Sequence, residues 1–206
     1  MNTRRMTLSD LDWSTELLTD AFSGLPPATH MFRGAKSRSK LTYFMKCGGR
    51  YALLYGECHT TENHEGVAQW LLPGETRMTP SRMFKAGMFA APLHFGLNDF
   101  KAFGSFVKHT DEVHRKVISD PHYYLLALGV APSSQGKGAA GRLLRTMLDR
   151  ADAEAKVVYL ETQHQENVAV YERFGFKVAS ETTIPDINLT NWGMARVPAG
   201  APRYHP

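Results

Sequence analysis

The chain has 206 residues, of which 43% are hydrophobic, with a net charge of +4 and a pI of about 9.1. This length suits one domain with an ordinary core, and the charge is too diffuse to indicate a nucleic-acid-binding protein. The sequence shows neither an apolar run of about 18 residues nor a signal-peptide pattern, so no membrane association is expected. Cys47 and Cys58 lack the spacing of a metal or redox motif, which favours free thiols and a cytoplasmic location.

The N-terminal third predicts a mixture of strands and helices, separated by clear breaks. Ser9 is expected to cap the first helix, which ends at a Gly-Leu-Pro-Pro break over residues 24–27. Two alternating segments then predict a hairpin. The expected elements are an edge strand at 4–7, the helix after Ser9, a helix at 39–55 bent near Gly48 and Gly49, and strands at 57–61 and 67–72.

The middle of the chain, about residues 75–120, is rich in Met and Phe. We expect two helices there, near 80–90 and 98–117, broken around Ala91 and Pro92. Two interpretations are open for the Met and Phe side chains: core packing, or a flexible apolar wall for a substrate. For the second, the candidate substrate-binding residues are Trp70, Phe103 and Phe106.

Residues 123–140 carry the most informative pattern. The apolar run from Tyr123 to Val130 predicts a buried strand, and Gln135 to Ala140 opens a helix after a short turn. Strand, small-residue loop and helix is an arrangement typical of phosphate binding. A P-loop is disfavoured because Gly138 follows Lys137 where Ser or Thr is needed. A dinucleotide fingerprint matches the glycines, but the chain is short for that fold.

The C-terminal part predicts three more strands and a short helix. The expected elements are a strand at 157–162, a helix at 167–174 ended by Gly175, and strands at 177–184 and 190–196. Residues 198–206 contain three prolines and are expected to be a flexible tail. Residues 1–197 are therefore predicted to form a single domain.

Two motifs in this order resemble those of the Gcn5-related N-acetyltransferase (GNAT) superfamily. Gln135-x-x-Gly138-x-Ala140 matches its Q/R-x-x-G-x-G/A loop, and Tyr171 to Phe176 match its Y-x-x-x-G-F signature. The resemblance implies an α/β fold in which a twisted mixed sheet of about seven strands carries helices on both faces. It also implies that acetyl-CoA binds where the fourth and fifth strands splay apart.

Further segments are similar to puromycin N-acetyltransferase-like members of that superfamily. They lie in the same order along nearly the whole chain, although residues 75–120 carry little of the match. This similarity indicates a subgroup and does not make puromycin the substrate. The segments are Ala21-Phe22, Pro27–Thr29, Val67–Trp70, Gly129–Pro132, Leu160–Thr162 and the block that starts at Tyr171.

The resemblance implies how the coenzyme is held. Backbone groups of the strand before the loop would contact the pantetheine arm, and loop amides would hold the pyrophosphate. Lys137 is either an electrostatic aid or a solvated side chain. The cofactor-binding residues expected on this basis are Leu128, Gly129, Val130, Gln135, Gly136, Lys137, Gly138, Ala139, Ala140, Asn167 and Phe174.

Two residues are candidates for proton transfer. The resemblance implies that Tyr171 protonates the leaving thiolate, and a phenol with a pKa of about 10 carries that proton at neutral pH. Glu161 is the leading candidate base, because apolar strand neighbours would raise its pKa; the alternative is a carboxylate paired with Arg or Lys. Family members often have Asn seven residues before this tyrosine, where His164 stands here, and Asn167 is either a substitute for it or a helix N-cap.

The sequence therefore predicts transfer of an acetyl group from acetyl-CoA to the amine of a small molecule in a ternary complex, without a metal. Other bases remain open among the histidines at positions 109, 114, 122 and 164. The alternative functions are a protein or peptide N-acetyltransferase and a non-catalytic acyl-CoA-binding module. The expected partners are the acceptor amine alone, with no nucleic acid or membrane, in a monomer or homodimer.

Overall fold

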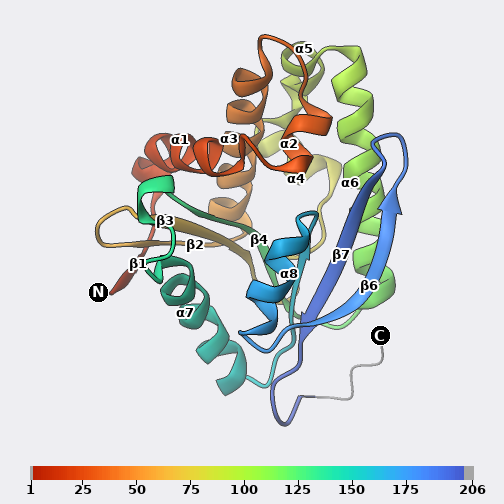
Figure 1. The fold of residues 1–206 in the computed structure, drawn as a ribbon. Helices are drawn as coiled ribbons and strands as arrows, with labels where there is room; N and C mark the ends of the chain where they lie inside the picture. Colours follow the sequence, from red (N-terminus) through yellow and green to blue (C-terminus); the bar gives the residue numbers. More distant parts are fainter. Residues whose placement is uncertain (1, 202–206) are drawn as a thin grey trace.

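A computed structural model describes residues 2–201, which contain one seven-stranded sheet in the order β1-β2-β3-β4-β5-β7-β6 (Figure 1). The sequence therefore predicted the fold class and the number of strands correctly. The strands are β1 (Thr3–Arg5), β2 (Gly56–Thr61), β3 (Gly66–Leu71), β4 (Tyr123–Val130), β5 (Val158–Thr162), β6 (Lys177–Ile184) and β7 (Leu189–Arg196).

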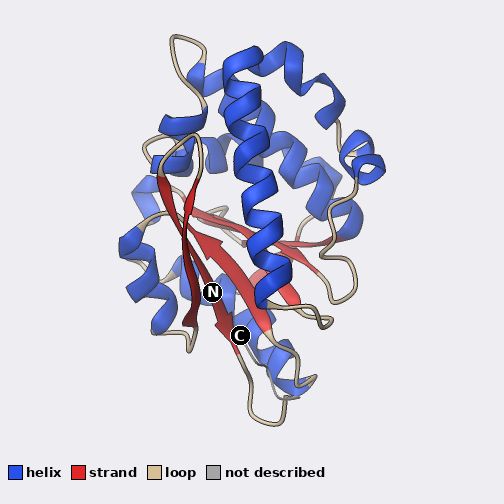
Figure 2. Ribbon diagram, turned by 90° about the vertical axis from the view of Figure 1, so that its right-hand side faces the viewer, coloured by secondary structure: helices blue, strands red, loops and turns tan. Residues whose placement is uncertain are grey.

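The helices cover both faces of the sheet. Apolar side chains of α7 pack with Trp70, Tyr123 and Tyr171 on one face, while α1, α3 and α6 pack on the other. Figure 2 shows the long α6 lying across this second face. The α-helices are α1 (Leu11–Phe22), α2 (Pro26–Met31), α3 (Ser37–Tyr55), α4 (Pro80–Lys85), α5 (Ala91–Phe95), α6 (Leu97–Val117), α7 (Ala139–Ala153) and α8 (Gln165–Glu172).

The pairing of β4 changes along its length. β4 pairs antiparallel with β3 from Tyr124 to Val130, with a bulge at Leu126 where the register shifts between Gln69 and Trp70. On the other edge, β5 pairs with it in parallel only over Tyr123–Leu125. Because the two strands separate after Leu125, the second half of β4 presents an unpaired backbone edge.

Several boundaries differ from the sequence predictions. Ser9 does not cap α1; it lies in a 3-10 turn, and the Asp10 carboxylate accepts a hydrogen bond from the Thr7 amide at 2.9 Å. The Gly-Leu-Pro-Pro segment ends α1, but Pro26 also starts α2, since proline is well tolerated in a first helical turn. For the same reason Pro92 lies inside α5 where a break was expected.

The helix predicted at 80–90 is also shorter than expected. Helix α4 ends at Lys85, and Gly87 follows it with a φ of 97°, a left-handed conformation that interrupts the helix. The helix predicted at 167–174 begins at Gln165 and ends at Glu172. Its N-cap position is held by His164, so Asn167 is not the N-cap.

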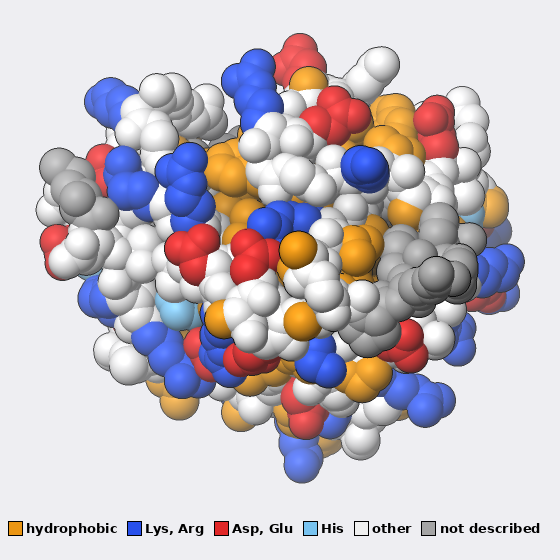
Figure 3. All heavy atoms as spheres, turned by 90° about the horizontal axis from the view of Figure 1, so that it is seen from below, with side chains coloured by type: hydrophobic (Ala, Val, Ile, Leu, Met, Phe, Trp, Pro, Cys, Tyr) orange, Lys and Arg blue, Asp and Glu red, His pale blue; other side chains and the backbone are white. Residues whose placement is uncertain are grey.

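The positive charge is spread over the surface, as expected from the sequence. Figure 3 shows Lys and Arg side chains interspersed with Asp and Glu on the face seen from below. Pairs such as Arg196 with Asp152, at 2.6 Å, neutralise part of it. Between residues 2 and 201, no helix is both long and apolar enough to cross a bilayer. Residues 202–206 of the predicted tail lie outside the described residues.

Candidate active site

The free edge of β4 borders the site. Leu128 pairs with Ala68 of β3 on one side and lines a cavity on the other. Gly129 allows α1 to approach closely, since a Cβ there would lie 2.6 Å from Leu18 Cδ2. Among residues 2–201, no strand pairs with the backbone of Leu126 to Val130 on this edge. Such an edge can hold an extended amide-bearing chain as an added strand.

The loop between β4 and α7 has a backbone suited to an anion. Gly136 and Gly138 have φ values of 74° and 80°, in the left-handed region that favours glycine. The first hydrogen bond of α7 runs from the Arg142 amide to the Gly138 carbonyl at 3.1 Å. The amides of Ala139 and Ala140 therefore have no helical acceptor and lie at the positive end of the helix dipole. The side chains from Gln135 to Gly138 are exposed, so a ligand can reach the loop.

Arg142 fixes this loop, a role that the sequence analysis missed. Its Nη1 donates to the Lys137 carbonyl at 3.2 Å, and its Nη2 pairs with the Glu65 carboxylate at 2.5 Å. The Lys137 Nζ instead donates to the Ser133 carbonyl at 2.8 Å within the loop. The spacing of four residues between Gly138 and Arg142 was the available signal, because it puts the guanidinium one helical turn from the loop.

Two further residues expected near the coenzyme lie beside this region. Phe174 packs against the start of α7, where a Cβ on Gly141 would lie 3.3 Å from its ring. Asn167 lines the cavity, and its Nδ2 donates to the Thr162 hydroxyl at 3.4 Å. Val130 is the last residue of β4, directly before the turn into the loop. The structure thus gathers the expected residues around one end of the sheet.

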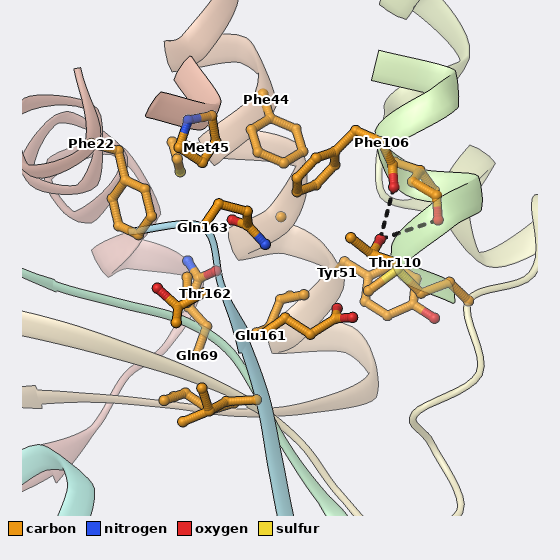
Figure 4. A pocket seen from close by; sticks show the side chains of 18 of the residues that line it. Phe22, Phe44, Met45, Tyr51, Gln69, Phe106, Thr110, Glu161, Thr162 and Gln163 are labelled. Carbon is orange, nitrogen blue, oxygen red and sulfur yellow. Dashed lines mark hydrogen bonds between the residues drawn. The ribbon is translucent and has the colours of Figure 1, made fainter. Parts of the chain in front are cut away.

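A cavity of about 320 Å³ opens where β4 and β5 separate (Figure 4). Its wall is mostly apolar and comes from α1, α2, α3 and α6, with Phe103 and Phe106 contributed by α6. Polar groups enter from β5 and the residues after it. The lining includes Phe22, Met31, Leu41, Phe44, Met45, Met83, Met88, Phe103, Phe106, Glu161, Gln163 and Tyr171.

Trp70 does not line this cavity, contrary to the sequence expectation. It is fully buried on the opposite face of the sheet, among Tyr123, Leu143 and Met147 under α7. Side chains alternate along a strand, so Gln69 faces the cavity while its neighbour Trp70 faces α7. The aromatic wall of the cavity is therefore made without Trp70.

Tyr171 lines the cavity from α8. Its side chain is buried, and its ring packs edge-on against Phe176 with the ring centroids 5.8 Å apart. Burial raises the pKa of its phenol to about 12, so the hydroxyl stays protonated at neutral pH. No hydrogen bond joins this hydroxyl to another described residue, which leaves its proton available to a ligand in the cavity.

Glu161 projects from β5 into the cavity (Figure 4). Three neutral donors hold its carboxylate. One carboxylate oxygen accepts from the Tyr124 hydroxyl at 3.1 Å. The other accepts from the Tyr159 hydroxyl and from Asn191 Nδ2, both at 3.2 Å. No Arg or Lys of residues 2–201 forms an ion pair with this carboxylate. The alternative of a carboxylate paired with a cation is therefore wrong.

Its environment raises the pKa of Glu161 to about 7. Loss of hydration is the main cause, and the negative charge of Asp111 adds to it. The hydrogen bonds from Asn191, Tyr124 and Tyr159 act in the opposite direction, because they stabilise the ionised form. A carboxyl group with this pKa is suited to accept a proton near neutral pH.

Three of the four histidines considered as bases fit less well than Glu161. His114 and His122 are buried and joined by a 2.7 Å contact between their Nε2 atoms, and burial lowers the pKa of His114 to about 3. His109 contacts the Thr182 hydroxyl at 2.9 Å, and its pKa is also lowered by burial. His164 lines the cavity, and its buried Nδ1 has no hydrogen-bond partner among the described residues, so it stays open as an alternative base.

The fold has a mixed sheet covered by helices, and its strands β4 and β5 separate beside a glycine-containing loop. This is the architecture of N-acetyltransferases. The chain belongs to the acetyltransferase (GNAT) family, whose model matches residues 65–176. It is thus an acetyl-CoA-dependent acyltransferase, and family membership implies acetyl-CoA as its co-substrate.

Individual relatives agree with this assignment. An uncharacterized N-acetyltransferase of Schizosaccharomyces pombe is 25% identical over 183 residues, which cover 85% of this chain and 74% of the relative. The crystal structure of a Corynebacterium glutamicum histone acetyltransferase HPA2 and related acetyltransferase has a TM-score of 0.65 at 21% identity, with 96% of each chain covered. A putative arylalkylamine N-acetyltransferase 7 of the yellow fever mosquito has a TM-score of 0.63 at 13% identity, covering 95% of this chain and 86% of that one. These structures share the fold.

Proposed function

We propose that this protein transfers the acetyl group of acetyl-CoA directly to the amine of a small molecule with an apolar or aromatic body. The observation that carries the proposal is the cavity between β4 and β5, which joins an apolar wall to Glu161 and Tyr171. An apolar body fits the wall formed by Phe44, Phe103 and Phe106, since burial of such surface favours binding. The amine would then lie at the polar end.

The proposed reaction needs two proton transfers. Glu161 takes a proton from the amine, whose nitrogen forms a bond to the thioester carbonyl carbon. The bond from that carbon to sulfur breaks, and Tyr171 gives its proton to the departing thiolate. The loop from Gln135 to Ala140 holds the pyrophosphate and the edge of β4 holds the pantetheine arm, so that the thioester lies beside the amine.

A screen of amines with acetyl-CoA, read by thiol release, tests the function. The panel contains arylalkylamines, puromycin, spermidine and a peptide with a free N-terminus. Puromycin is included because segments from Ala21 to Phe176 are similar to puromycin N-acetyltransferase-like proteins. Turnover of apolar amines above the others is expected; a clear preference for spermidine or for the peptide would contradict the proposed substrate class.

Substitution Gly138→Val is expected to weaken acetyl-CoA binding at least tenfold, which corresponds to about 1.4 kcal/mol. Gly138 has a left-handed φ of 80°, and a side chain there would also hold the pyrophosphate away from the amides. Calorimetry with acetyl-CoA measures the change. Gly34→Val is the control, because Gly34 has a φ of 81° with nothing near its Cβ position. Equal losses of affinity in both variants would contradict the role of the loop.

Substitution Phe106→Ala is expected to raise KM for an apolar amine about tenfold or more and to leave KM for acetyl-CoA unchanged. Loss of one buried aromatic contact costs roughly 1.5–3 kcal/mol. Phe106 is the cleaner test because Phe103 also packs on Phe44 and Phe95 in the core. Phe100→Ala is the matched control, since Phe100 lies on the same helix, is 38% exposed and does not line the cavity.

A further inference from the structure

A chain of two side-chain amides leads from Glu161 to Gln163, a partly exposed residue of the cavity wall. Asn191 Nδ2 donates to the Glu161 carboxylate at 3.2 Å, and Gln163 Nε2 donates to Asn191 Oδ1 at 2.6 Å. Asn191 is fully buried on β7, next to the pair that Glu161 forms with Gly193. Gln163 follows β5, is partly exposed and lines the cavity.

The direction of this chain is fixed at the end held by Glu161. An ionised carboxylate only accepts hydrogen bonds, so Asn191 must turn its NH₂ group toward it. The carbonyl oxygen of Asn191 then faces Gln163, which must in turn present its own NH₂ group. Consequently Gln163 Oε1 is the free end of the chain, and none of residues 2–201 donates a hydrogen bond to it.

Gln163, the residue directly after β5, lies on the same side of the chain as Glu161. They are two residues apart, so their side chains point the same way, and Figure 4 shows both projecting into the cavity. The free carbonyl oxygen of Gln163 is therefore a hydrogen-bond acceptor in the wall of the cavity that Glu161 enters. Such an oxygen stabilises an N–H donor and offers nothing to a nitrogen that carries only methyl groups.

We infer that Gln163 is a specificity-determining residue that accepts a hydrogen bond from an N–H group of the acceptor amine. The inference rests on the proposed function, in which Glu161 is the ionised base that orients the chain. It predicts that the site selects ligands by their N–H donors and not by positive charge alone. Because the fixed amide chain keeps this oxygen in place, little rotamer freedom is lost when the amine binds.

Two probes of equal charge separate these properties. Phenethylamine has an ammonium group with N–H donors, whereas phenethyltrimethylammonium has the same charge and ring with none. Calorimetry measures both affinities at about pH 8, above the pKa of about 7 for Glu161, with saturating coenzyme A so that no turnover occurs. The wild-type protein is expected to prefer phenethylamine at least tenfold.

Three variants test the residue. Gln163→Met, which keeps the length but has no carbonyl, is expected to reduce this preference at least fivefold. Gln163→Glu keeps an acceptor oxygen but loses the NH₂ group that donates to Asn191 Oδ1, so it is expected to keep part of the preference, more than Gln163→Met keeps. Gln165→Met is the control, because Gln165 is exposed at the start of α8 and does not line the cavity.

Several results would overturn the inference: a preference in Gln163→Met within twofold of wild type, an equal loss in Gln165→Met, or no binding of phenethylamine to the wild-type protein. The binding comparison is independent of turnover. Absence of thiol release with every amine would instead refute the proposed function, even if the N–H preference and its dependence on Gln163 were observed.

Discussion

Substitution Glu161→Gln is expected to lower kcat for the acceptor amine about 10³-fold, within the range of general base catalysis. The amide keeps the size of the side chain but takes no proton from the amine. Binding of acetyl-CoA is expected to stay unchanged, because the loop at 135–140 lies on a separate segment. Steady-state kinetics with calorimetry distinguish the two effects.

The matched control is Glu172→Gln, which changes an exposed carboxylate on α8. Its kcat is expected to remain within twofold of wild type. A thermal unfolding curve checks that Glu161→Gln still folds, since the Tyr124 and Tyr159 hydroxyls lose an ionised acceptor there. A folded Glu161→Gln protein with more than a third of wild-type kcat would exclude Glu161 as the base.

The same residue sets the expected pH dependence. The active form is the ionised carboxylate, so kcat/KM should rise with pH, reach half its limit near 7 and then level off. The amino group of an alkylamine acceptor has a much higher pKa, near the value of about 10 for a lysine side chain. It therefore adds a second, separate rise to the pH profile of kcat/KM. The groups that face Glu161 are Tyr124, Tyr159 and Asn191 as donors, with Asp111 from α6. Tyr124→Phe removes a hydrogen-bond donor to the ionised Glu161 carboxylate. The rise of kcat/KM near pH 7 should therefore move to higher pH.

The residues expected at the coenzyme end could be named from the sequence because the chemistry expected there is local. The glycines at 136 and 138 and the start of α7 lie within a few residues of each other. Left-handed backbone, small side chains and a helix N-terminus are all properties of one short segment. Tyr171 could be proposed for a similar reason, since it belongs to a compact motif at the end of α8.

The acceptor end depends on contacts between distant segments, which the sequence did not reveal. Glu161 meets Tyr124 and Asn191 only because β5 lies between β4 and β7 in the sheet. Trp70 was misplaced because strand alternation decides its face, and an apolar strand buried on both faces hides that alternation. Gln163 carried no signal at all, since an isolated glutamine after a strand fits an ordinary loop.

Substitution Tyr171→Phe is expected to lower kcat about 10²-fold and to change acetyl-CoA affinity by less than threefold. The buried ring and its contact with Phe176 survive the substitution, so only the hydroxyl is lost. A thiol in water has a pKa of about 8.5, and burial raises the pKa of a thiol as it raises that of this phenol to about 12, so in the cavity the departing thiolate is a stronger base than in water and can take the proton. The effect should therefore fall on kcat and not on binding.

Tyr51→Phe is the matched control for this prediction. Tyr51 also lines the cavity and is buried, but its hydroxyl donates to the Arg77 carbonyl at 3.2 Å and has no proton to offer a ligand. A small change in its kcat is expected. Replacement of acetyl-CoA by an acetyl thioester with a more acidic thiol should also narrow the gap between wild type and Tyr171→Phe, because a better leaving group needs less protonation. If the ratio of kcat between wild type and Tyr171→Phe is the same with both acetyl donors, Tyr171 has only a packing role.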